Sequence, residues 1–191
     1  VSSLNFRSGD TVANAVVVPV PADRVVCVFV YGVADVLVDV TGYVTDGFTR
    51  VGPLRVVDTR ASSPVGAADG SGVPLRVDLS SVVPADAVAV AANVTVVLGS
   101  APPERGFVTE CECGARPEQS QTNFRPGDTV PHAVVVPVPA DRVACVFVYG
   151  VADVLVHVTG YRTDGSTTVA PVRVADSAAV SPVGVPRAAG I

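Results

Sequence analysis

Residues 5–47 read NFRSGDTVANAVVVPVPADRVVCVFVYGVADVLVDVTGYVTDG, and residues 123–165 read NFRPGDTVPHAVVVPVPADRVACVFVYGVADVLVHVTGYRTDG. The likeness runs on to residues 66 and 184 at an offset of 118 (123 − 5), with roughly three quarters of the paired positions identical. Repetition at a fixed period is typical of repeat architectures. An enzyme needs one asymmetric set of unlike residues, whereas a scaffold or multivalent binder uses a copied surface. The repeat therefore favours a structural or binding role.

The composition predicts an all-β protein. About half of the residues are apolar (49%), and most of these are valine; Met, Trp and Lys are absent. The stiff β-branched side chain of valine packs well on a pleated sheet. The 16 prolines and 17 glycines make long helices improbable. We expect short antiparallel strands arranged as a β-sandwich or in a jelly-roll-like way.

Turn residues divide both copies and the segment between them into strand-length pieces. In the first copy the expected strands are residues 15–20, 25–31 and 36–43, and the second copy repeats them. Aspartates in the turns, such as Asp10 and Asp23, are expected to cap them rather than to bind calcium. Prolines inside AVVVPVP indicate an edge strand or a bulge. In the central segment the expected strands are residues 75–80, 87–98 and 107–113.

The copies flank one central segment, residues 67–122, that occurs once. This order predicts the closing half of a first β-module over residues 1–50 and a complete module over 51–165. Residues 166–191 would begin a further repeat or form a C-terminal extension. Three explanations stay open: an excerpt from a longer array, a single domain with both copies around one centre, or a subunit completed by a neighbour. The absence of Met indicates a processed form or a segment of a longer product.

Charge and motifs exclude several function classes. A net charge of −5 argues against a nucleic-acid surface, and no apolar run approaches the ~18–20 residues of a membrane-spanning helix. Neither a GxSxG elbow, nor HExxH, nor a phosphate loop is present, so we expect no enzyme activity, cofactor or metal. Strand alternation places His157 on a solvent face, and we also expect Glu110 and Glu112 to be solvated, on the face opposite the neighbouring cysteines.

Four cysteines are present: Cys27, Cys111, Cys113 and Cys145. They allow three complete pairings, among which the residues alone do not choose. Cys111 and Cys113, two apart on a strand, point to the same face, and Cys27 and Cys145 are equivalent positions of the two copies. An economical arrangement links the central strand to both copies. Such bonds persist outside the cytosol. The alternative is buried free thiols; a zinc site is disfavoured further, because CxC lacks the usual zinc spacing.

The order of motifs resembles a β-rich repeat of secreted and surface proteins of actinobacteria. The family pattern runs LLDTR, ALNVTVT, GFVTVYPCG.RP, SNLNF, a cysteine strand and VDVTGYF. The resemblance covers most of the chain and implies a surface-displayed, non-catalytic β-module. It also implies a Cys113–Cys145 bond, which leaves Cys27 to pair with Cys111. The doubled cysteine, and ADSA at residues 175–178 where the first copy has VDTR, depart from the pattern. The matching stretches are RVVDTR (55–60), VAANVTV (90–96), GFVT (106–109), CGARP (113–117), SLNF (3–6), QTNF (121–124) and VTGY (40–43, 158–161).

These observations predict an extracellular structural repeat protein that self-associates into a surface stalk, coat or filament. Incomplete sheets leave unpaired edges that a neighbouring subunit can cover. The alternative is a module that binds carbohydrate or cell wall. Its aromatic platform would come from the four tyrosines, Tyr31, Tyr43, Tyr149 and Tyr161, although a core or edge role is favoured for them. Asn93 begins a formal glycosylation sequon, NVT, within an expected strand.

Overall fold

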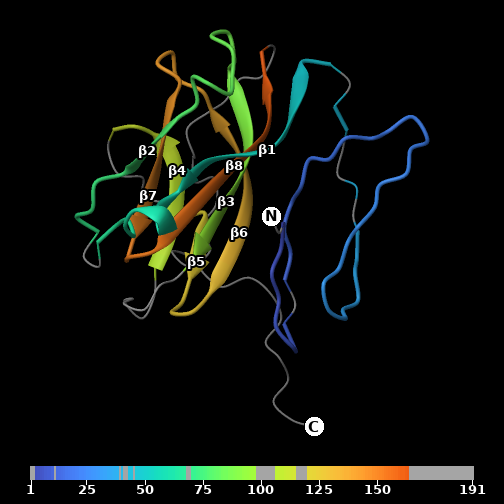
Figure 1. The fold of residues 1–191 in the computed structure, drawn as a ribbon, viewed down its shortest axis with the longest axis horizontal. Coiled ribbons are helices and arrows are strands. Elements are labelled where there is room, and N and C mark those ends of the chain that lie inside the picture. The colour runs from blue at the N-terminus through green and yellow to red at the C-terminus, as the bar shows by residue number, and fades with distance from the viewer. Residues whose placement is uncertain are drawn as a thin grey trace, which may run out of the picture.

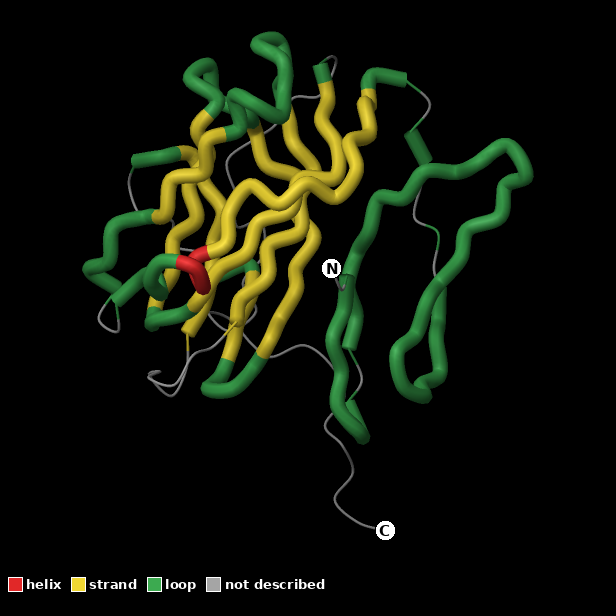
Figure 2. Tube along the Cα trace, viewed as in Figure 1, coloured by secondary structure: helices red, strands yellow, loops and turns green. Residues whose placement is uncertain are grey.

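Two antiparallel sheets of four strands each pack face to face in the computed structural model of this chain (Figure 1). The structure describes residues 3–10, 12–38, 40, 43–44, 46–67, 70–97, 106–114 and 120–163. Apart from a 3-10 turn at Thr59–Ala61, every regular element in these ranges is a strand (Figure 2). The predicted all-β sandwich is therefore confirmed.

The strand order in each sheet places the second copy among strands of the central segment. The first sheet has the order β1-β8-β3-β6, and the second has the order β2-β7-β4-β5. The first sheet consists of β1 (Phe48–Asp58), β8 (Asp153–Arg162), β3 (Ala89–Val97) and β6 (Thr129–Pro137). The second consists of β2 (Leu75–Asp78), β7 (Val143–Tyr149), β4 (Gly106–Glu112) and β5 (Thr122–Phe124). The strands predicted in the central segment and in the second copy are thus present.

Strand β6 lies at an edge of the first sheet, which is one of the two alternatives that its prolines predicted, an edge strand or a bulge. Pro131 and Pro137 pair with Thr95 and Ala89 of β3. A proline cannot donate to a ladder and is tolerated where one side of the strand has no further neighbour. The prolines therefore fix β6 as the last strand on that side.

Valine fills the space between the sheets. Val96 and Val158 of the first sheet and Val108 and Val148 of the second belong to one continuous buried cluster. Each buried valine side chain contributes about 1.5 kcal/mol or more to folding through removal of apolar surface from water. The cluster replaces the larger Leu, Ile and Met residues that the sequence lacks or uses sparingly.

The first copy does not form the strands that its sequence predicts. Among the described residues of 3–44, which we call the N-terminal arm, none is in a strand. Large apolar side chains there are exposed; Phe29 is 88% exposed, whereas its counterpart Phe147 is 2% exposed. A strand needs a neighbour for its backbone hydrogen bonds, and the equivalent positions beside β1–β4 are filled by the second copy.

The arm runs beside β6 (Figure 1), and its side chains contact β6 and the turn that precedes it. Arg7 donates a hydrogen bond to the carbonyl of Gly127 (2.9 Å) and forms an ion pair with Asp128 (3.4 Å). The Oδ1 atom of Asn14 accepts a hydrogen bond from the backbone N–H of Ala133 (3.1 Å). The arm therefore covers part of the β6 edge without extending its ladder.

Candidate functional site

A row of polar residues crosses the outer face of the first sheet. Arg55 of β1 lies opposite His157 of β8, which lies opposite Asn93 of β3. His157 is 3% exposed, so the expectation of a solvent-facing histidine is wrong. Alternation placed its side chain correctly on the face away from the valine core. The side chain is nevertheless buried, because the alternation does not report what covers that face.

His157 is held as a neutral hydrogen-bond acceptor. Its Nε2 atom accepts a hydrogen bond from Nε of Arg55 (2.9 Å). Burial, together with the neighbouring Arg55 charge, lowers the pKa of His157. A catalytic histidine presents one nitrogen to a nucleophile and the other to an orienting carboxylate. Here the arginine occupies Nε2, and buried Nδ1 has no hydrogen-bond partner in the described structure. This geometry supports a structural role.

The Asp-Thr-Arg stretch after β1 forms a clasp. Asp58 accepts hydrogen bonds from Nη1 of Arg55 (2.7 Å) and from Nε of Arg60 (2.8 Å). The hydrogen bonds from Arg60 hold the pKa of Asp58 well below its usual range. The hydroxyl of Thr59 donates to Asp153 (2.9 Å) and accepts from the backbone N–H of Val154 (2.9 Å). The clasp fixes the end of β1 to the start of β8.

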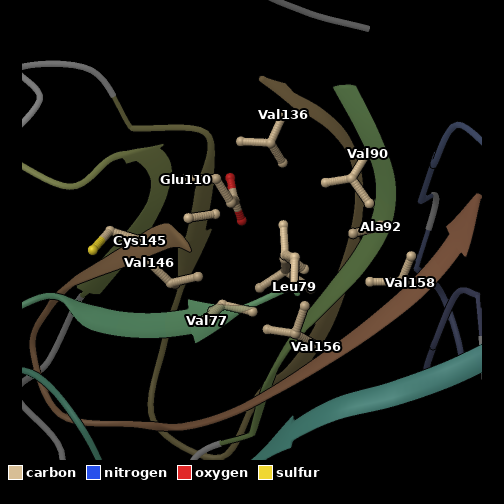
Figure 3. Close-up of a pocket in the computed structure, with 12 residues that line it drawn as sticks. Val77, Leu79, Val90, Ala92, Glu110, Val136, Cys145, Val146, Val156 and Val158 are labelled. Carbon is tan, nitrogen blue, oxygen red and sulfur yellow. The ribbon is translucent and has the colours of Figure 1, made fainter. Parts of the chain in front are cut away.

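Glu110 lies inside the sandwich, contrary to the expectation of a solvated side chain. It is 4% exposed, and its carboxylate points into the interior, near Leu79 and Val136 (Figure 3). Neither carboxylate oxygen has a hydrogen-bond partner in the described structure. Burial raises the pKa of Glu110 to about 7. The cavity that it lines has a volume of about 20 Å³, enough for a water molecule but not for a substrate. The Glu112 side chain lies outside the described residues.

One disulfide, between Cys113 and Cys145, links the central segment to the second copy. It matches the bond that the family resemblance implies. The second expected bond is absent: Cys27 and Cys111 carry thiols, and Cys27 is exposed in the arm. Register explains the difference, because Cys145 lies directly opposite Cys111 and so occupies the position that Cys27 would need.

The remaining predicted positions do not converge on a ligand site. Asn93 is buried in the central strand β3, which argues against a sugar on its side chain in the folded protein. Tyr149 stacks on Phe107 with ring centroids 5.1 Å apart. Tyr31 and Tyr43 are exposed in the arm. The tyrosines thus belong to different surroundings.

The described residues hold neither a cluster of metal-binding side chains nor a long apolar helix. No three of their His, Cys, Asp and Glu side chains cluster closely enough to hold a metal ion. Within the same ranges, no helix has the length and apolar character needed to cross a membrane.

Comparison with models of protein families, with characterised proteins and with solved structures found no match to this chain.

Proposed function

We propose that this chain is a non-catalytic structural repeat protein of the cell exterior, which builds a stalk, coat or filament through β-sheet contacts between subunits. One observation carries the proposal: the arm has the sequence of half a sandwich and leaves its apolar side chains exposed. Phe29 and Leu37 are 88% and 87% exposed. An apolar surface of this kind is typical of a site that another protein surface covers.

The polar groups and the disulfide support the proposal. Arg55, Asp58 and Thr59 connect β1 to β8, so this polar cluster serves the fold. The Cys113–Cys145 bond persists best in an oxidising environment such as the cell exterior. The arm, as a near copy of half a module, could bind the sandwich of another subunit. Such a contact joins two unlike surfaces head to tail, and open polymers form from contacts of this type.

Negative-stain electron microscopy and light scattering over a range of concentrations test the proposal. We expect ordered polymers from the unaltered chain and their loss in a Phe29→Ser, Leu37→Ser variant. The matched control is Val33→Ser, because Val33 is also exposed but its counterpart Val151 does not belong to the core. Thermal unfolding of the sandwich should be the same in all three proteins. A monodisperse monomer under every condition would contradict the proposal.

A carbohydrate- or cell-wall-binding module is the second candidate. The exposure of Tyr31 and Tyr43 favours it, because exposed aromatic rings can stack on sugar rings. Pull-down with purified cell-wall polysaccharide distinguishes the two. Saturable binding that Tyr31→Ala and Tyr43→Ala abolish would support glycan recognition, whereas unchanged retention in these variants would reject it.

A further inference from the structure

We infer that residues 5–44 of the arm are a second closing half for the sandwich. They bind the chain's own β1–β4, here called the acceptor half, in the positions that β5–β8 occupy, and the two copies exchange there. Four independent features of the structure support this: the core residues, the turns, the link to β1 and the cysteines. The inference goes beyond the proposed function, since a chain that never polymerises can still exchange its closing halves.

The arm carries the side chains that the acceptor half buries. Leu155 is 6% exposed in β8, and its counterpart Leu37 is 87% exposed. Within the buried apolar set the two copies differ at one position, where the arm has Val26 and the second copy has Ala144. Outside that set, the arm has Asp39 where the second copy has His157, so in the docked arm Arg55 would meet a carboxylate in place of an imidazole. The buried set of the second copy is Phe124, Val136, Ala144, Cys145, Val146, Phe147, Val148, Ala152, Val154, Leu155, Val156 and Val158. Its counterparts are Phe6, Val18, Val26, Cys27, Val28, Phe29, Val30, Ala34, Val36, Leu37, Val38 and Val40.

The turns of the arm already have the conformation of the second copy. Asp10 accepts from the N–H of Arg7 (2.8 Å), as Asp128 accepts from Arg125 (2.9 Å). The left-handed φ of Arg24 is 58°, and that of its counterpart Arg142 is 55°.

Two further turns repeat in the same way. Asp23 accepts from the N–H of Val25 (3.1 Å), and Asp141 from that of Val143 (3.1 Å). Gly32 and Gly150 have φ values of 108° and 100°. Local sequence thus fixes the turns of the arm before any sheet forms. Docking then has to add only the backbone hydrogen bonds between strands.

The link between arm and β1 fits the required register. Phe48 of β1 pairs with Arg162 of β8. At an offset of 118 the counterpart of Arg162 is Val44 (162 − 118), so residues 45–47 would form a three-residue hairpin loop. Such loops end in a left-handed residue, and Gly47 has φ 71°. The arm can therefore pair with β1 in the register that β8 uses, through a short local hairpin.

The cysteines provide a marker for the exchange. In the arm-docked form Cys27 takes the place of Cys145, opposite Cys111 and within reach of Cys113. The Cys27 thiolate attacks the Cys113 sulfur, forms the Cys27–Cys113 bond and releases the Cys145 thiolate. The reaction exchanges one disulfide for another and needs no external oxidant.

A Cys145→Ser variant of the full chain tests the inference by trapping the arm-docked form. Refolding in oxidised and reduced glutathione lets oxidised glutathione accept two electrons from Cys27 and Cys113 and leave as two reduced molecules. Non-reducing peptide mapping should then find Cys27–Cys113 in chains of monomer mass. Cys27→Ser is the matched control and should keep the Cys113–Cys145 bond. Absence of Cys27–Cys113, or its presence only between two chains, would overturn the inference.

A second variant tests the exchange without cysteines. A Cβ at Gly160 would overlap the Phe48 ring and lie 2.9 Å from the carbonyl oxygen of Thr49, so Gly160→Val disfavours β8. We expect hydrogen-exchange protection to move from residues 153–162 to residues 35–44. The double variant Gly42→Val, Gly160→Val should protect neither segment. Loss of protection throughout the single variant would overturn the inference. Polymer assays play no part here, so failure of the proposed function would show separately.

Discussion

Cys111 lies directly opposite Cys145 across the β4–β7 pair, yet Cys145 forms its disulfide with Cys113, two residues further along the chain. The bond joins positions 32 residues apart. Both cysteines that face Cys145 come from the central segment, and both copies of the repeat carry a cysteine for this position. β4 and the residue that follows it thus present two cysteines to a position for which each copy carries a cysteine.

Removing this disulfide should destabilise the sandwich. For a loop of this length the chain-entropy description gives about 4 kcal/mol. We expect Cys113→Ala to lower the free energy of unfolding, measured by urea denaturation in the absence of reductant, by up to that amount. Cys27→Ala should change it little, because Cys27 is exposed in the arm. Equal losses in the two variants would show that the disulfide does not stabilise the sandwich.

Glu110 should make the protein less stable as the pH rises from about 4.5 to about 7. In this window the unfolded carboxyl is ionised while the folded one keeps its proton, so the unfolded state binds fewer protons and stability falls. The full effect is about 3 kcal/mol. Denaturant unfolding at several pH values should show it as the difference between the unaltered chain and Glu110→Gln, whose amide does not titrate.

His157 contributes a slope of the opposite sign. Its pKa is lowered in the folded state, so the unfolded state takes up a proton first as the pH falls below about 6.5. Stability should therefore fall with decreasing pH in the unaltered chain relative to His157→Gln. NMR of the imidazole nitrogens should show an unprotonated Nε2 that accepts from Arg55. A pKa above the ordinary value would refute the buried, neutral imidazole.

The hydroxyl of Thr59 should stabilise the folded protein, although Thr59 lies in the 3-10 turn and not in a strand. Thr59→Val removes a donor to Asp153 and an acceptor for the buried N–H of Val154. Leaving such groups unsatisfied costs about 1–3 kcal/mol, which thermal or urea unfolding should detect. Thr49→Val is the control, because Thr49 is exposed on β1; a comparable loss there would argue against the clasp.

Local sequence predicted turns and strand-length pieces well, because both are properties of neighbouring residues. It predicted β3, β4 and β7 and the edge position of β6. It failed in the arm, where nearly the same residues form no strand in the described structure. Whether such a segment becomes a strand depends on a partner far away in the sequence, and here one acceptor half faces two matching segments.

The alternation of residues along a strand also did not predict which single polar residues are buried. Alternation assigns Glu110 and Cys111 to opposite faces, but it does not say which face is interior. The valine core lies on the Glu110 side, and Phe107, Phe147 and Tyr149 gather on the Cys111 side. The burial of His157 was not predicted because its partner Arg55 comes from a strand 102 residues earlier in the chain. The disulfide, by contrast, followed from the family resemblance.

The proline-bearing edge strand β6 makes the two edges of the first sheet unequal. Pro131 and Pro137 lack the N–H groups that an added strand needs, and Asn14 already accepts the hydrogen of Ala133. Lateral growth of that sheet on this side is blocked, so strands recruited from outside have to join next to β1. Any fibre built by such joining would be polar, with two unlike ends.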